Sequence, residues 1–122
     1  MSIQLQMEQM SGYLAARFIG VAVPGEASRQ FGLIAEHCKL TNNNKLLIDG
    51  TRLEIIKKLT VMDRFIFGER LWIFARYGVK VACVSRPELI DPQKFGILVA
   101  QNRCVKVEVF TDFRAAEEWL LK

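Results

Sequence analysis

The sequence predicts an α/β fold built on a mostly parallel five-stranded sheet, with an antiparallel strand at its N-terminal edge and four helices. Strand-like and amphipathic helical segments alternate along most of the chain, which is typical of parallel strands joined by right-handed crossovers. A short turn joins the first two strand-like segments, which favours an antiparallel hairpin. Polar residues alternate with apolar ones in the first and last strands, so one sheet face should be less covered than in a doubly wound fold. The predicted element order is ββαβαβαβα.

Five segments have the residue patterns of strands. They span residues 3–8, 13–19, 45–49, 79–85 and 105–109. The third is a continuous apolar run, as expected of a strand buried within a sheet, whereas the first and last alternate with period two. The pair Asp49-Gly50 is predicted to turn the chain. Residues 51–59 would then form an unusually long strand-to-helix loop, a candidate lid or contact loop.

Four segments have helical periodicity and helix-start signals. The first opens at Pro24 and ends at 42–44, the second runs from Thr60 to Tyr77, the third from Asp91 to Asn102, and the last opens at Thr111. Proline suits the first turn of a helix, and the pattern Thr60-x-x-Asp63 can supply side-chain oxygens to the first unpaired amides. Apolar residues on each helix recur at spacings of three and four, so each helix should cover the sheet.

Length and composition favour one globular domain over residues 1–122, located in the cytoplasm. No apolar run approaches the ~20 residues that a membrane-spanning helix needs, so stable membrane insertion is not expected. The net charge is +4, but the basic residues are spread along the chain, which argues against nucleic acid as a partner. The three cysteines lack metal-site spacing and are interpreted as buried free thiols.

Polar residues follow the predicted parallel strands at the edge where open α/β sheets bind ligands. The candidate ligand edge consists of Asp49, Thr51, Ser85, Arg86 and Thr111. The same residue types are also what turns and helix caps require, and that alternative stays open. No glycine-rich phosphate loop, nucleophile motif or metal-ligand motif is present. The single histidine, His37, is followed by Cys38, but neighbouring side chains on a helix point in different directions, so the two cannot easily form a nucleophile-base pair. We therefore expect no catalytic residues, no metal and no cofactor.

The predicted helix over 60–77 carries more apolar surface than one contact requires. One stripe contains Met62, Ile66 and Ile73, and a second contains Phe67, Leu71 and Phe74. One stripe can cover the sheet, and the other needs a neighbouring helix, a ligand or a second subunit. Phe67, Leu71 and Phe74 are therefore candidates for a dimer interface or an apolar pocket, with burial against flanking helices as the alternative.

The element order, the LLID strand, the VKVACVS strand and the closing VFTDFRAAEEWL resemble the stand-alone bacterial STAS-like, or SpoIIAA-like, family. The resemblance covers nearly the whole chain. It implies a SpoIIAA-like β-α superhelical fold and a non-enzymatic regulatory module that binds a protein partner or forms a homodimer. Similarity to the STAS/SEC14-like members of the group implies, as the alternative, a small apolar, lipid-like ligand. A cavity for such a ligand would be lined by residues such as Phe65, Phe67, Trp72, Phe95 and Trp119.

In the related anti-sigma-factor antagonists, a kinase phosphorylates a serine or threonine at the start of the second helix, within an Asp-Ser-Ser-Gly-like motif. The matching segment here is Lys57-Lys58-Leu59-Thr60, so only Thr60 carries over as a hydroxyl. The acidic residue and glycine of the motif are absent. A phosphate at this helix N-terminus would be favoured by the helix dipole and the two lysines. The resemblance therefore implies Thr60 as a phosphorylation site.

Overall fold

The computed structural model describes residues 3–122 and contains a five-stranded sheet in the order β1-β2-β3-β4-β5. The strands are β1 (Gln4–Gln9), β2 (Leu14–Ala22), β3 (Lys45–Ile55), β4 (Lys80–Val84) and β5 (Val107–Phe110). β1 pairs with β2 antiparallel, and all other pairs are parallel. The predicted mixed sheet, its antiparallel edge strand and the strand order along the chain are confirmed.

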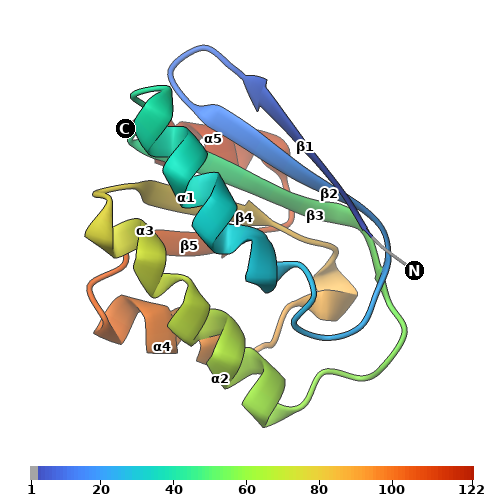
Figure 1. Cartoon of the computed structure of the whole chain (residues 1–122). Helices are drawn as coiled ribbons and strands as arrows, with labels where there is room; N and C mark the ends of the chain where they lie inside the picture. Colours follow the sequence, from blue (N-terminus) through green and yellow to red (C-terminus); the bar gives the residue numbers. More distant parts are fainter. Residues whose placement is uncertain (1–2) are drawn as a thin grey trace.

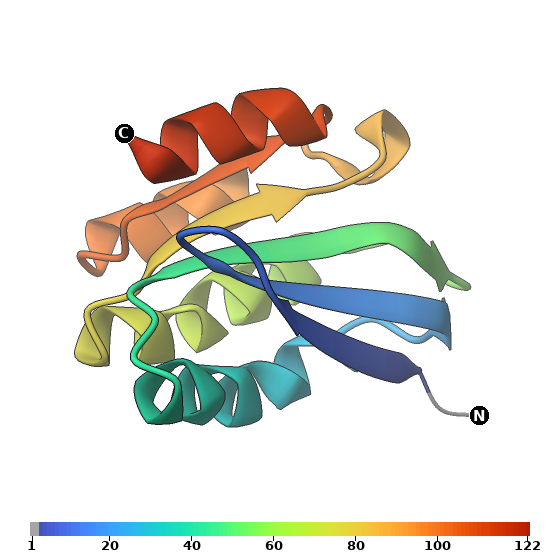
Figure 2. The ribbon, with the colours of Figure 1, turned by 90° about the horizontal axis from the view of Figure 1, so that it is seen from above.

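Helices cover the two faces of the sheet unequally (Figures 1 and 2). They are α1 (Phe31–Leu40), α2 (Val61–Arg70), α3 (Trp72–Arg76), α4 (Phe95–Asn102) and α5 (Phe113–Leu121). α1 to α4 lie on one face over the larger core, and α5 lies alone on the other over a smaller cluster. The prediction of one less covered face is thus confirmed. Within residues 3–122, no helix combines the length and apolarity needed to cross a bilayer.

Two predicted helix starts are wrong, and both errors have a backbone cause. The first helix does not open at Pro24, because Gly25 has a φ of +87° and the chain makes turns before a 3-10 segment, Ser28–Gln30, leads into α1. The third does not open at Asp91, because Lys94 has a φ of +52°. The Asp91 carboxylate still accepts hydrogen bonds from the amides of Gln93 and Phe95, at 3.3 and 3.0 Å. A capping side chain at Asp91 therefore shapes a turn before the helix.

The predicted helix over 60–77 is present as two consecutive segments, α2 and α3, which separate at Leu71. Its start is confirmed, because Thr60 and Asp63 form a reciprocal capping box. The Thr60 hydroxyl accepts from the Asp63 amide at 3.0 Å, and the Asp63 carboxylate accepts from the Thr60 amide at 2.8 Å. These hydrogen bonds satisfy two amides at a helix end that otherwise lack partners.

β3 is longer than predicted, and Asp49-Gly50 does not end it. Arg17 of β2 pairs with Asp49, but Ile19 pairs with Arg52, so two residues of β3 face one residue of β2. This is a β-bulge. The buried Asp49 carboxylate accepts hydrogen bonds from the Thr51 amide at 2.9 Å and from the Thr51 hydroxyl at 2.6 Å. The chain then continues as a strand to Ile55, so the predicted loop over 51–59 is mostly strand.

The core between the sheet and α1 is organised around Phe31. Its ring packs against Phe74 with centroids 5.4 Å apart and against Phe67 with centroids 5.7 Å apart. Aromatic pairs at this separation contribute roughly 0.5–1.5 kcal/mol beyond the area that they bury. Phe31 therefore fixes both α2 and α3 against α1.

Two glycines allow α2 and α4 to pack at very short range. A Cβ atom on Gly68 would lie 2.8 Å from the Val99 Cβ, and one on Gly96 would lie 2.8 Å from the Arg64 carbonyl oxygen. Real Cβ atoms do not approach other heavy atoms that closely. By contrast, a Cβ on Gly32 of α1 would meet no atom within 4 Å. Close packing, rather than empty space, therefore explains Gly68 and Gly96.

Gly68→Ala should lower the free energy of unfolding by about 1–3 kcal/mol, because α2 and α4 would have to separate. Gly32→Ala is the matched control and should raise it by about 0.5–1 kcal/mol, since alanine loses less backbone entropy in a helix. Urea denaturation followed by circular dichroism measures both. Equal effects of the two substitutions would contradict the packing argument.

Candidate functional site

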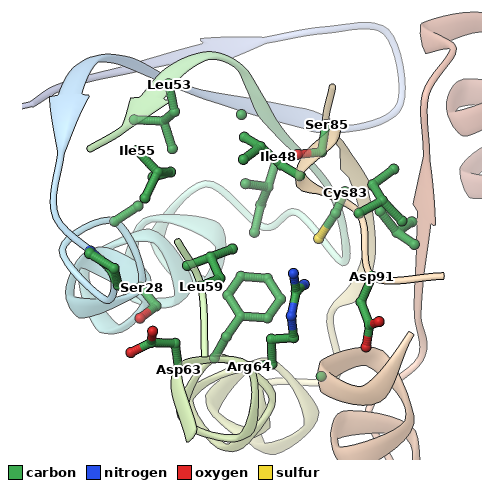
Figure 3. A pocket seen from close by; sticks show the side chains of 18 of the residues that line it. Ser28, Ile48, Leu53, Ile55, Leu59, Asp63, Arg64, Cys83, Ser85 and Asp91 are labelled. Carbon is green, nitrogen blue, oxygen red and sulfur yellow. The ribbon is translucent and has the colours of Figure 1, made fainter. Parts of the chain in front are cut away.

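A cavity of about 200 Å³ lies between the sheet and the helices of its more covered face, at the carboxyl ends of the parallel strands (Figure 3). Its walls are mostly apolar. The apolar lining includes Phe18, Ile48, Leu53, Ile55, Leu59, Phe67, Cys83, Ile97 and Val109. Ligand sites of small molecules are typically such concave, apolar spaces with a few polar groups at defined positions. This cavity is the candidate functional site.

The extension of β3 beyond the bulge builds one wall of the cavity. β4 ends at Val84, opposite Asp49, whereas β3 continues beside β2 as far as Ile55. Leu53 and Ile55 of this extension project toward the helices, and Leu59 of the β3–α2 connection lies beyond them (Figure 3). These residues were not predicted to line a cavity, because residues 51–59 were expected to form a lid or contact loop. The alternation of Arg52-Leu53-Glu54-Ile55 was the signal that could have identified them.

Two carboxylates at the cavity are engaged by backbone amides. Asp63 accepts from the Thr60 amide, and Asp91 accepts from the amides of Phe95 and Gln93. These hydrogen bonds are the main reason why the pKa of each carboxyl group lies below its usual value, and the charge of Arg64 makes a smaller contribution to both. Both groups are therefore ionised at neutral pH. The Asp63 carboxylate belongs to the capping box of α2, and the Asp91 carboxylate holds the turn that precedes α4.

Arg64 of α2 directs its guanidinium into the cavity, toward Ile48 and Cys83 (Figure 3). Among residues 3–122, its side chain has no salt bridge within 4.0 Å and donates no hydrogen bond. The Ser85 hydroxyl also lines the cavity without a side-chain hydrogen bond to another described residue. Ser28, in contrast, donates to the Gly25 carbonyl oxygen and accepts from Arg70. Arg64 and Ser85 are thus the polar side chains of the cavity lining that form no side-chain hydrogen bond or salt bridge with another described residue.

The five residues of the predicted polar ligand edge do not converge. Only Ser85 lines the cavity. Asp49 and Thr51 bond to each other at the bulge, and Arg86 donates through Nη2 to the Leu53 carbonyl oxygen. Thr111 is exposed in the β5–α5 connection. The predicted alternative of turns and helix caps does not describe Asp49 and Thr51 either, because both lie at a β-bulge within β3.

The predicted stripe of Phe67, Leu71 and Phe74 is divided in the structure. Leu71 and Phe74 are fully buried within the chain, so they are not available to a second subunit, which corrects that part of the expectation. Phe67 lies in the cavity wall. Of the other residues expected around a cavity, Phe65 and Trp72 are exposed, Phe95 is outside the lining, and Trp119 packs on the far face with Phe110.

A different apolar stripe faces outward from α2 and α3. It consists of Val61, Met62, Phe65 and Trp72, whose exposed fractions are 70%, 63%, 37% and 46%. We call it the outer stripe. Spacings of three, four and seven residues place these side chains along one side of a helix. Of these four residues, only Met62 belonged to a predicted stripe, and it is exposed although that stripe could have covered the sheet.

Thr60 is exposed at the start of α2, next to the outer stripe. Its hydroxyl accepts the Asp63 amide in the capping box, and Lys57 and Lys58 precede it as exposed residues. The charge of Lys57 also acts on the Asp63 carboxylate, so basic and acidic groups both lie near this helix start.

The cysteines provide no obvious reactive site. Cys38 and Cys83 are buried as expected, and burial raises their thiol pKa to about 11 and about 12. Cys104 is exposed, which corrects the expectation that all three are buried. Within the described part of the chain, no three His, Cys, Asp or Glu side chains are grouped to hold a metal ion.

Comparison with solved structures gives matches over nearly the whole chain. A crystal structure of an uncharacterised DUF3478-family protein with a SpoIIAA-like fold, from Shewanella loihica PV-4, is 22% identical and covers 98% of this chain and 93% of its own, with a TM-score of 0.53. An anti-sigma factor antagonist from Mycobacterium paratuberculosis is 12% identical and covers 99% of this chain and 96% of its own, with a TM-score of 0.60. No family model and no curated protein matches the sequence. The agreement in architecture over nearly the whole chain shows that this chain has a SpoIIAA-like fold, as the sequence predicted.

Proposed function

We propose that this domain is a non-enzymatic regulatory module that binds another protein through the outer stripe of α2 and α3. The observation that carries the proposal is that four large apolar side chains on one side of α2 and α3 are exposed to solvent. Exposed apolar patches of this kind usually mark contact surfaces. The partner is expected to combine apolar side chains with acidic ones, since Lys57 and Lys58 are exposed beside the stripe. The likeness in fold to an anti-sigma factor antagonist supports a role in protein interaction.

Met62→Glu should weaken binding of the partner by roughly tenfold or more, because it places a charge within the apolar surface of the contact. Leu40→Glu is the matched control, since Leu40 is 76% exposed at the far end of α1. Affinity capture from the native cells with both variants and the wild type identifies the partner. Titration of the purified partner then gives the affinities.

A captured protein must bind the wild type and Leu40→Glu alike and lose affinity for Met62→Glu. If every captured protein binds all three chains equally, the outer stripe is not the contact surface. A second copy of this chain is one candidate partner. Light scattering should then give a dimer mass for the wild type and a monomer mass for Met62→Glu.

Thr60 is the proposed regulatory site of this surface. A phosphate on its hydroxyl would place negative charge beside Asp63 and near Lys57 and Lys58, at the end of the outer stripe. The helix dipole would favour the phosphate, and the Asp63 carboxylate would oppose it. Phosphorylation would therefore disturb the capping box and change the charge that a partner meets.

Mass spectrometry of the protein from its native cells should detect a phosphopeptide containing Thr60 under at least one growth or stress condition. Thr41 is the internal control, because it is also an exposed threonine but lies at the end of α1, where its hydroxyl donates to the His37 carbonyl oxygen. An unmodified Thr60 under all conditions would end the proposal of a phosphoswitch.

The second candidate function is binding of a small apolar ligand in the cavity. The observation that favours it is a space of about 200 Å³ with mostly apolar walls. A cavity of roughly 150 Å³ is large enough for one benzene molecule. The cavity could therefore hold a ring or a short hydrocarbon chain.

Native mass spectrometry of gently purified protein should show a small non-covalent adduct that disappears on denaturation. The denatured sample of the same preparation is the control. A spectrum with bare polypeptide alone would contradict a tightly held natural ligand.

A further inference from the structure

The cavity has one charged group that points into it and has no partner in residues 3–122. Arg64 extends its guanidinium from α2 toward the apolar wall at Ile48 and Cys83 (Figure 3). A guanidinium has five donors and loses hydration when it approaches apolar walls, so a partner that accepts hydrogen bonds would be stabilising. The Ser85 hydroxyl, also uncommitted, lies on the strand side of the same cavity.

The acidic residues near Arg64 do not provide that partner. The Asp63 carboxylate accepts a hydrogen bond from the amide of Thr60, which caps α2, and the Asp91 carboxylate accepts one from the amide of Phe95, the first residue of α4. The positive ends of these helices offset part of the negative charge. Lys94, the other basic residue of the lining, pairs with Glu108 at 3.3 Å. Arg64 is therefore the charge of the cavity that remains available to a ligand.

We propose that the cavity binds a small amphipathic anion, whose carboxylate or phosphate oxygens pair with Arg64 and whose hydrocarbon part lies among Ile48, Leu53 and Phe67. The proposal rests on the second candidate function above and adds the chemical class of the ligand. The planar fork of arginine matches either kind of anionic group with two parallel hydrogen bonds. The volume fits a hydrocarbon part of roughly six to eight carbons, by comparison with a cavity that holds benzene.

The test compares four probes with the same hydrocarbon chain. Octanoate, octyl phosphate, 1-octanol and octylammonium are each titrated into the full chain and followed by isothermal calorimetry and by NMR of backbone amides. At least one anionic probe should bind about tenfold or more tightly than octanol, because a hydrogen bond to a charged group is stronger than one to a neutral group. Octylammonium should bind most weakly. The amides of Gly50, Ser85 and Gly96 should shift.

Two arginine variants assign the preference to one side chain. Arg64→Met keeps the length of the side chain and removes its charge, so it should abolish the preference for the anion while octanol still binds. Arg114→Met makes the same change on an exposed residue of α5, on the far face of the sheet, and should leave the preference intact. Arg64→Lys should retain part of it.

Each outcome separates the two proposals. Equal binding of the anions and octanol, or a preference that survives Arg64→Met, would overturn the assignment of the head group while leaving an apolar ligand site. Failure of all four probes to bind would overturn both. A preference for octyl phosphate over octanoate, or the reverse, selects the kind of anionic group within the proposed class.

Discussion

The hydrogen bonds from Thr51 to the Asp49 carboxylate hold the bulge on which the shape of the site depends. Before the bulge, Leu46 and Ile48 face α1 to α4 and Leu47 faces α5. The extra residue shifts this alternation by one, so Leu53 and Ile55 also face the helices. Without the shift, period-two alternation would point Arg52 and Glu54 toward the core. The bulge thus turns the end of β3 into an apolar wall.

The second constraint is the close approach of α2 and α4 at Gly68 and Gly96. This contact fixes the position of α2. One side of α2 faces the cavity, and another side is exposed to solvent. Phe67 and Arg64 face the cavity, while Met62 and Phe65 lie in the outer stripe. The capping box at Thr60 fixes where this helix begins. An event at the start of α2 is therefore close both to the proposed partner surface and to the cavity.

Much of the fold could be predicted from residue patterns, because strand and helix periodicities are local properties. The antiparallel edge strand, the parallel order and the Thr60 start of α2 follow from such patterns. The starts of α1 and α4 could not, because left-handed backbone at Gly25 and Lys94 depends on the tertiary path of the chain. An apolar pocket beside Phe67 was expected, but the wall that β3 contributes to it was missed for a similar reason. Asp49-Gly50 is a strong turn signal, and only its pairing opposite β2 shows that it forms a bulge within a strand.

Cys83 places a thiol of low reactivity in the cavity wall. Its thiol is buried on β4, and burial raises its pKa to about 12, so the sulfur stays protonated at physiological pH. The thiolate is the nucleophilic form of cysteine, and its near absence makes this wall resistant to alkylation and to disulfide exchange. At physiological pH this sulfur would therefore contribute packing contacts to a molecule in the cavity and would form no covalent bond with it. Contact with this wall would thus leave any binding in the cavity reversible.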